Sequence, residues 1–481
     1  MDAPVPLIIC ALLAGVAVLV RPAHARVRAA AMLLALALAV VILIAEIYHS
    51  SQFAVLRHHP GPSLAGAVLA AIVLGLLAWL IDRRPQLLAI GAALTLPFRI
   101  PITAGGSTAN LLVPLYAVVA AGALAFAVPR LLGRVTDEDT DEKPAGWLEW
   151  SLLGLVVVYA IQASYSDDFT RALQNVVFFY VPFAILFVLL RRLAWTTKLA
   201  VQCLGVLVAL AVVFVAIGFW EYHTRHLLLN PKVIADNQFA PYFRVNSLFF
   251  DPNIFGRFLA IVMVGVTGVV LWTQERRAVI GGAVVLAVLW GGLVLTLSQS
   301  SFGALLVGLA VLGALRWSVK WALVGAVAAL AVGAVFVVAA PSTVRLHLGD
   351  SKSADTATSG RYDLIKGGAN LFADRPVQGF GAGSFPREFR RHDKSSSEKA
   401  VSASHTIPLT VAAEQGAIGL LLYAAVLVFA FVMLFRGARA SPVRATVAAA
   451  FAALVFHTLL YAAFLEDPLT WALLGLGAGL P

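Results

Sequence analysis

Apolar runs long enough to cross a lipid bilayer recur along the whole chain, and they constrain its fold more than any other feature. They are rich in alanine, leucine, valine and glycine, without the alternation that marks a strand. About 20 apolar residues cross a hydrocarbon layer as a helix, which satisfies its own backbone hydrogen bonds in lipid. We predict spans at 5–20, 29–47, 63–81, 86–104, 110–130, 148–163, 175–190, 197–219, 253–273, 278–297, 300–315, 319–340, 406–434, 444–464 and 469–480.

The composition agrees with this pattern. Hydrophobic residues make up 60% of the chain and charged residues only 12%, whereas a soluble domain is roughly half apolar and about a quarter charged. We therefore expect an all-α polytopic membrane protein with about 12–15 transmembrane helices. Both cysteines, Cys10 and Cys203, fall inside apolar runs, so they imply neither a disulfide framework nor a metal site.

The net charge of +10 could suggest nucleic acid, but the positions of the basic residues argue against such a partner. They gather in every second loop, which is the positive-inside pattern of membrane proteins. The basic loops contain Arg21, Arg26, Arg28; Arg83, Arg84; Arg130, Arg134, Lys143; Arg191, Arg192, Lys198; Arg276, Arg277; Arg316, Lys320; and Arg436, Arg439, Arg444. This topology predicts that loops 220–252 and 341–404 lie outside the cytoplasmic (inner) membrane, because long loops cross largely regardless of charge.

The chain divides into five segments on this basis. They are an N-terminal transmembrane bundle (1–135), a cytoplasmic acidic linker (136–147), a second bundle with outer loop 220–252 (148–340), a large extracytoplasmic loop (341–404) and C-terminal transmembrane helices (405–481). The large loop is the one long polar segment in a hydrophobic chain. We therefore expect the chemistry of the protein at this outer face.

His405 stands where the large loop re-enters the membrane, at the outer end of an apolar helix. The positive end of the helix dipole disfavours a charged imidazolium, and nearby arginines act in the same direction. A neutral histidine can accept a proton from a hydroxyl, as a general base must. The alternative is an interfacial histidine that only caps the helix, and position alone leaves both open.

Three arginines could bind phosphate. Arg244 and Arg361 lie in the outer loops near the predicted membrane boundary, where a guanidinium presents a planar fork of donors to phosphate oxygens. Either could instead extend toward lipid headgroups. Arg257 lies about one turn inside the membrane, four residues after Asn253 and on the same helix face. An intramembrane charge is a functional candidate, whereas Asp251-Pro252 before it is typical of a helix start.

Other polar features are less specific. Ser298-Gln-Ser300-Ser301 occupies an outer hairpin, where the serines could line a site or join helices; a serine nucleophile is not expected, because the Gly-x-Ser-x-Gly turn is absent. Gly379, Gly381 and Gly383 could form an anion-binding nest or simple turns. Glu414 lies inside an apolar helix and could pair with one of the arginines or balance a core site.

Taken together, residues from about Arg244 to Leu480 resemble the O-antigen ligase and O-antigen polymerase (Wzy-type) superfamily. The resemblance rests on Arg244–Asn253, Ser298–Ser301, Ser359-Gly-Arg361, Arg375–Phe385 and the pattern His405-x3-Leu409-x4-Glu414-x-Gly416-x2-Gly419. Their order is more specific than any one of them. One departure is Ser300-Ser301, where the family often has Ser-Arg; Arg257 or Arg99 could replace the missing arginine.

The resemblance implies a GT-C-like helical bundle with one large extracytoplasmic loop, and an inverting glycosyltransferase that needs neither metal nor cofactor. Such proteins move a glycan from an undecaprenyl-pyrophosphate carrier to a hydroxyl-bearing glycan or glycolipid acceptor. His405 would then be the catalytic residue, and Arg244 and Arg361 would hold the pyrophosphate. Asn253, Arg257, Glu414 and Ser300 complete the expected substrate-binding set. The 341–404 loop would cover the site as a lid.

We favour a ligase, because one outer loop dominates, over a Wzy-type polymerase that differs only in its acceptor. A bicarbonate-type transporter is an alternative from another class. Transporters tend to place polar or broken helices at the membrane midplane, often in two related halves, whereas the polar residues of this chain cluster at one face and its halves show no repeat. A non-catalytic scaffold of an envelope assembly complex is a third possibility.

Overall fold

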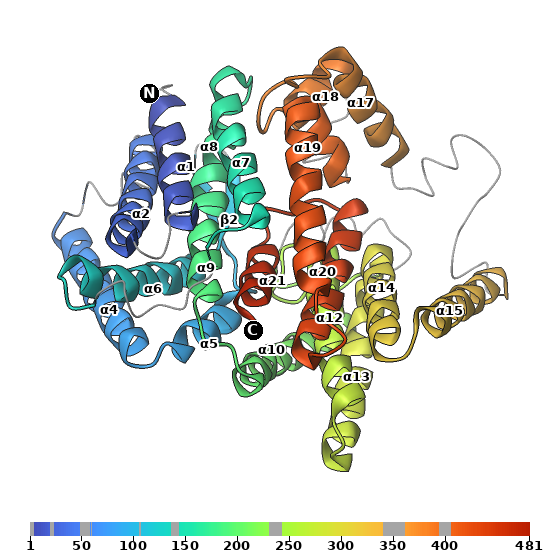
Figure 1. The fold of residues 1–481 in the computed structure, drawn as a ribbon. Coiled ribbons are helices and arrows are strands. Elements are labelled where there is room, and N and C mark those ends of the chain that lie inside the picture. Colours follow the sequence, from blue (N-terminus) through green and yellow to red (C-terminus); the bar gives the residue numbers. More distant parts are fainter. Residues whose placement is uncertain are drawn as a thin grey trace.

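The structure, a computed structural model, describes residues 4–19, 24–48, 58, 60–104, 107–135, 144–229, 243–339, 361–393 and 406–481. These ranges are almost entirely helical (Figure 1). The helices are α1 (Pro4–Leu19), α2 (Ala25–Ile47), α4 (Pro60–Arg83), α5 (Gln86–Thr95), α6 (Val113–Leu131), α7 (Trp147–Gln162), α8 (Phe169–Asn175), α9 (Val181–Arg191), α10 (Thr197–Thr224), α12 (Pro252–Trp272), α13 (Arg276–Thr296), α14 (Gln299–Arg316), α15 (Val319–Ala339), α17 (Arg361–Asp374), α18 (Phe385–Asp393), α19 (Ile407–Phe435), α20 (Pro442–Leu459) and α21 (Pro468–Gly479). A 3-10 turn (Ala163–Tyr165) follows α7, and a π-helical turn (Val176–Tyr180) joins α8 to α9.

The predicted all-α membrane fold is confirmed. Within the described ranges, 11 helices are long and apolar enough to cross a membrane, and four shorter apolar helices accompany them. One predicted span, 86–104, is wrong in its second half: α5 ends at Thr95, and β1 (Ile100–Ala104) pairs antiparallel with β2 (Ser107–Leu111). Pro97 and Pro101 explain the difference, because proline has no backbone N–H to continue a helix.

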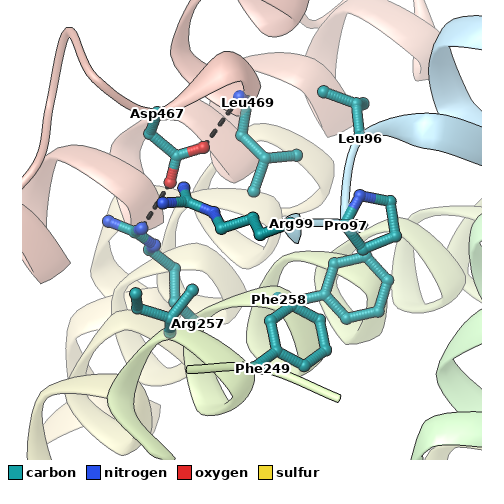
Figure 2. A pocket seen from close by; sticks show the side chains of 9 residues that line it. Leu96, Pro97, Arg99, Phe249, Arg257, Phe258, Asp467 and Leu469 are labelled. Atoms are coloured by element: carbon teal, nitrogen blue, oxygen red, sulfur yellow. Dashed lines mark hydrogen bonds and ion pairs between the residues drawn. The ribbon is translucent and has the colours of Figure 1, made fainter. Parts of the chain in front are cut away.

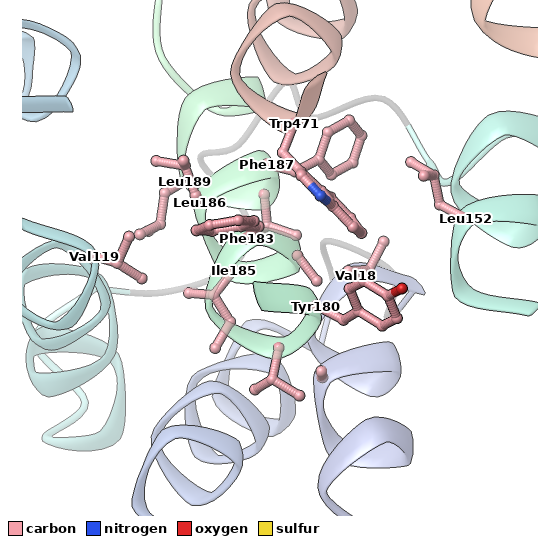
Figure 3. Close-up of a cluster of buried hydrophobic side chains, with 14 of the residues drawn as sticks. Val18, Val119, Leu152, Tyr180, Phe183, Ile185, Leu186, Phe187, Leu189 and Trp471 are labelled. Carbon is pink, nitrogen blue, oxygen red and sulfur yellow. The ribbon is translucent and has the colours of Figure 1, made fainter. Parts of the chain in front are cut away.

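A hydrophobic core forms around α9, whose side chains from Val181 to Leu190 are all buried. Helices α1, α6 and α21 pack against it. Figure 3 shows Phe183 and Phe187 of α9 close to Trp471 of α21. The indole N–H of Trp471 donates to the Leu465 carbonyl at 2.8 Å, which satisfies the one polar group of this buried ring. The core therefore joins the N-terminal and C-terminal parts of the chain.

A second core surrounds α12, which packs against α10, α13, α14 and α20. Gly308 of α14 faces Val264 of α12 and Ala453 of α20, and an added Cβ would contact both side chains. Small residues let helices approach closely, and such packing drives helix association in lipid. The C-terminal ends of α10, α13 and α20 meet the N-terminal ends of α12, α14 and α21 at one end of this group.

Helices α17 and α18 lie at the N-terminal end of α19 (Figure 1). Their apolar side chains form a small separate cluster of Leu364, Leu371, Phe380, Phe385, Phe389 and Ala413. Helix α19 is interrupted at Gly416, where φ is 64° and ψ is −162°. The described part of the predicted outer loop is thus a packed unit on an interrupted helix.

Candidate functional site

Arg244 is held against the C-terminal end of α13. Its Nε donates to the Thr296 carbonyl at 2.9 Å, and the backbone N–H of Val245 donates to the Leu295 carbonyl at 3.2 Å. The last carbonyls of a helix have no partner within the helix, and they carry the negative end of its dipole, which favours a cation. The Arg244 side chain is half-buried.

A buried carboxylate fixes the segment that carries Arg244. Glu221, near the end of α10, is 0% exposed. It accepts backbone N–H bonds from Asn246 at 3.2 Å, Ser247 at 2.8 Å and Leu228 at 3.2 Å. Ser247 has a φ of 52°, which is uncommon outside glycine. These bonds hold the turn after Arg244 in one conformation and so orient its side chain.

The N-terminal turn of α12 supplies the second partner of Arg244. Arg244 donates from Nη2 to the Asn253 side-chain oxygen at 3.1 Å. Asp251 caps this helix by accepting the Asn253 N–H at 2.6 Å, and Pro252 occupies the first helical position, as the sequence predicts. The carboxylate of Asp251 also accepts a hydrogen bond from the Tyr461 hydroxyl.

Arg257 lies one turn further along α12 and is almost completely buried. Its Nη2 forms an ion pair with Asp467 at 2.5 Å, and its Nη1 donates to the Ala463 carbonyl at 3.1 Å. Arg257 is 1% exposed and Asp467 is 2% exposed. A buried charge is tolerated when it is paired and hydrogen-bonded, and this pair meets both conditions.

Arg99 faces the same carboxylate. Figure 2 shows Arg99 and Arg257 pointing toward Asp467, with Phe249 and Phe258 beside them. These residues line a cavity of about 20 Å³, and a water molecule needs roughly 10–15 Å³. Two guanidinium groups with one carboxylate leave an excess of positive charge. This cavity is therefore suited to an anionic oxygen.

Tyr461 connects the two arginine groups. Its hydroxyl interacts electrostatically with Arg244 and Arg257 as well as with Asp251, and Arg99 interacts with Tyr461, Arg257 and Asp467. Burial, followed by the Asp251 carboxylate, raises the pKa of the Tyr461 hydroxyl well above its usual value. Tyr461 thus remains a neutral hydrogen-bond donor among three cations.

The serine hairpin between α13 and α14 adjoins this group, because Ser301 Oγ donates to the Asn253 carbonyl. Its serine side chains are buried. Ser300 Oγ is 3.2 Å from His457 Nε2, and Ser301 Oγ is 3.3 Å from the same nitrogen. Ser298 Oγ is 2.7 Å from Ser301 Oγ. None of these four side chains is more than 1% exposed. The predicted polar lining at Ser300 is therefore a buried hydrogen-bonded cluster.

Glu414 binds to the glycine-rich segment instead. Its two carboxylate oxygens accept the backbone N–H groups of Gly383 at 2.9 Å and Phe385 at 3.1 Å. The alternating glycines thus form an anion nest occupied by a carboxylate of the same chain. We call residues 376–385 the glycine loop. In the described residues, Glu414 contacts a different set of groups from Arg244 and Arg257.

The glycine loop also completes the backbone of α19 at its interruption. The N–H groups of Phe380 and Gly381 donate to the carbonyls of Ala413 and Glu414 at 3.1 and 2.8 Å, and the Ala417 N–H donates to the Pro376 carbonyl at 2.7 Å. Interrupting a helix leaves backbone groups that need partners in a membrane. The two motifs around the glycines and around Glu414–Gly416 are therefore two halves of one structural unit.

Gly416→Ala is expected to destabilise this unit. The positive φ at Gly416 and its contact with the Val377 carbonyl both exclude a Cβ. Gly437→Ala is the matched control, because Gly437 has a φ of 76° but nothing lies within 4 Å of its Cβ position. We expect Gly416→Ala to cost at least about 1 kcal/mol more than the control, measured by thermal unfolding in detergent. Equal losses of stability in the two variants would show that contact with the glycine loop does not restrict residue 416.

A charged cluster attaches α18 to the connection between α7 and α8. Arg391 pairs with Asp167 and with Glu388, the latter at 2.7 Å, and Arg387 donates to the Asp167 carbonyl. A hydrogen bond from Glu388, together with Arg391, lowers the pKa of Asp167, whereas burial and the same bond raise the pKa of Glu388. These contacts hold α18 against the connection between α7 and α8.

The structure brings together four of the predicted site residues, namely Arg244, Asn253, Arg257 and Ser300. His405 lies outside the described residues. Arg361 is the first residue of α17, and its side chain lies outside the description as well. The sequence analysis missed Tyr461, Asp467, His457 and Glu221. Asp467-Pro468 repeats the pattern of Asp251-Pro252 and also caps a helix, which is the one signal that could have drawn attention to it.

The fold and the site define a multi-pass membrane protein with a buried, arginine-rich polar site. Within the described ranges, no group of three or more His, Cys, Asp or Glu side chains could hold a metal ion. Residues 284–424 match the family model described as O-antigen ligase. This match places that part of the chain in the O-antigen ligase and polymerase superfamily, whose activity is in general glycan transfer. No curated protein matches the chain.

The matched segment runs from α13 into α19. It includes Ser300, Arg361, His405 and Glu414, whereas Arg244, Asn253 and Arg257 lie before it and Asp467 lies after it. The family match and the arginine site therefore come from different parts of the chain. They meet where Arg244 contacts Thr296 at the end of α13.

Proposed function

We propose that the protein is an inverting, metal-independent glycan transferase of the O-antigen ligase type, acting at the extracytoplasmic face of the cytoplasmic membrane. Its donor is a saccharide on undecaprenyl pyrophosphate, and its acceptor is a hydroxyl of a glycan or glycolipid. The observation that carries this proposal is the convergence of Arg244, Arg257 and Arg99 around Tyr461. A pyrophosphate needs such charge-assisted donors.

In the proposed reaction, the acceptor hydroxyl attacks the anomeric carbon of the donor sugar from the face opposite the pyrophosphate. A new carbon–oxygen bond forms as the bond to the pyrophosphate oxygen breaks, and His405 takes the proton of the hydroxyl. Undecaprenyl pyrophosphate leaves with the bonding electron pair. Arg244 and Arg361 stabilise its growing negative charge, which is electrostatic stabilisation by groups already in place.

Each arginine of the described site contributes differently. Arg244 is half-buried and donates to the Thr296 carbonyl and to the Asn253 side-chain oxygen, and a guanidinium carries five N–H donors in a planar fork. Asp467 neutralises the charge of Arg257, so Arg257 would orient the pyrophosphate more than it would add net positive charge. Arg99 adds the uncompensated charge of the cavity. This arrangement supports the role of Arg257 and Arg99 in place of the arginine that Ser301 replaces.

Arg244→Gln tests the proposal. Glutamine retains a side chain of similar length but loses the charge, and a hydrogen bond to a charged group contributes about 1.5–3 kcal/mol. We expect kcat/KM for the lipid-linked donor to fall by about 10- to 100-fold. Arg225→Gln is the control, because Arg225 lies over Tyr222 and Phe243 outside the site. Equal effects of both variants would contradict a specific phosphate contact at Arg244.

The product pattern on a gel separates the ligase from the polymerase. Loss of the protein should leave full-length polymer on the lipid carrier if it is a ligase. It should shorten the polymer ladder if it is a polymerase. Flux of a small solute into vesicles that contain no lipid-linked glycan would instead support the transporter alternative.

A further inference from the structure

His457 is a buried histidine that the proposed reaction does not use. It lies near the C-terminal end of α20 with 0% exposure. Its Nε2 is 3.2 Å from Ser300 Oγ and 3.3 Å from Ser301 Oγ, and its ring meets that of Tyr461 edge to face at 5.6 Å. Ser298 and Ser300 are also within hydrogen-bond distance, at 3.2 Å. This histidine thus joins α20 to the hairpin between α13 and α14.

The hairpin in turn holds two partners of Arg244. Ser301 Oγ donates to the backbone carbonyl of Asn253 at 3.3 Å, and the Asn253 side chain accepts from Arg244. The other partner of Arg244 is the Thr296 carbonyl, and Thr296 Oγ1 accepts the N–H of Ser298 at 3.2 Å. A displacement of the hairpin would therefore move two acceptors that orient the Arg244 guanidinium.

Close packing makes this connection stiff. An added Cβ at Gly256 of α12 would lie 2.6 Å from Ser301 Oγ and 3.1 Å from Thr296 Oγ1. The helices are thus as near as glycine allows. A polar network in such an apolar surrounding is costly unless its members are hydrogen-bonded, and when they are it favours one arrangement. The cluster is too deeply buried for His457 or a serine to reach a substrate.

We propose that His457 is a positioning residue, which holds the Ser298–Ser301 hairpin against α12 and thereby fixes the Arg244 guanidinium for the pyrophosphate of the donor. The inference rests on the proposed function, because the pyrophosphate is the ligand that Arg244 would bind. His457 would act through Ser301, Thr296 and Asn253, and not by contact with the substrate itself. Its loss should weaken pyrophosphate binding more than it changes the chemical step.

The test measures binding of undecaprenyl pyrophosphate to the full-length protein in detergent, alongside glycan transfer. His457→Phe keeps a flat ring and removes both nitrogens. We expect its affinity to fall about 10-fold or more, with a rise in donor KM, because small displacements of a positioned group can cost up to about 100-fold. His457→Gln, whose amide can still meet the serine hydroxyls, should recover most of the affinity. Ser301→Ala should reproduce the loss in part.

The control is Thr267→Val, which removes a hydroxyl that donates to the Met263 carbonyl at 2.8 Å in the same helix α12. Thr267 lies 14 residues after Asn253, about 21 Å along the helix. The Thr267→Val variant should bind undecaprenyl pyrophosphate with the affinity of the wild type. Thermal unfolding of all variants identifies any that fail to fold. If His457→Phe does not fold, the binding measurement on Ser301→Ala tests the proposal instead.

Combining His457→Phe with Arg244→Gln distinguishes positioning from general damage. If His457 acts through Arg244, the double variant should bind no more weakly than Arg244→Gln alone. Multiplied losses, or unchanged affinity in His457→Phe, would overturn the inference while leaving the proposed function intact. If the wild-type protein neither binds undecaprenyl pyrophosphate nor transfers glycan, the proposed function itself falls.

Discussion

His405→Ala is expected to lower glycan transfer by about 10²- to 10⁴-fold, which is the usual contribution of a general base. His405 is two residues before the start of α19 at Ile407. We expect the positive end of this helix to disfavour the imidazolium form, which would leave a neutral ring to accept the proton of the acceptor hydroxyl. The loss should appear in kcat, while the affinity for undecaprenyl pyrophosphate stays close to that of the wild type.

His392→Ala is the matched control for this experiment. His392 lies on α18, is exposed, and pairs with Asp374 at 2.9 Å. Its removal should leave transfer nearly unchanged. Wild-type rates in His405→Ala would rule out the proposed mechanism and favour a scaffold. A loss of pyrophosphate affinity equal to the loss of rate would instead make His405 a phosphate ligand.

The transmembrane helices could be predicted because each one is encoded locally. An apolar run of sufficient length is enough, and bilayer thickness sets that length. The failure at 86–104 is also local: Pro97 and Pro101 stop the helix, although apolar residues continue into β1. Hydropathy alone cannot distinguish the continuation of an apolar helix from a short apolar strand that follows it.

The site was predictable only in part, because its contacts join distant residues. Arg244 and Asn253 are close in sequence, and the sequence analysis placed both near the donor. Arg257 and Asp467 are separated by 210 positions, and no local pattern pairs them. Glu414 could be recognised as an unusual acid in an apolar helix, but its partners are backbone N–H groups of the glycine loop. The alternating glycines indicated a possible anion nest, but no local pattern names Glu414 as the anion that binds there.

Asp467→Asn is expected to destabilise the protein by about 3–5 kcal/mol, the usual cost of breaking a buried ion pair. Asparagine keeps the shape and can still cap α21, where Asp467 accepts the Leu469 N–H at 2.9 Å. The variant therefore removes only the charge that compensates Arg257 and Arg99. Thermal unfolding in detergent measures the loss. Asp251→Asn is the control, since it alters the same kind of cap without that ion pair.

The double variant Arg257→Met with Asp467→Leu separates folding from function at this pair. Replacing a buried ion pair with apolar residues of similar size is often neutral for stability, so the double variant should recover most of the unfolding midpoint that Asp467→Asn loses. It should still transfer glycan poorly, because Arg257 would no longer be present beside Arg99 at the cavity. If stability and transfer both return, the pair serves only to hold α12 against the start of α21. In that case Arg244 and Arg99, with Arg361 from the outer segment, would have to bind the pyrophosphate without Arg257.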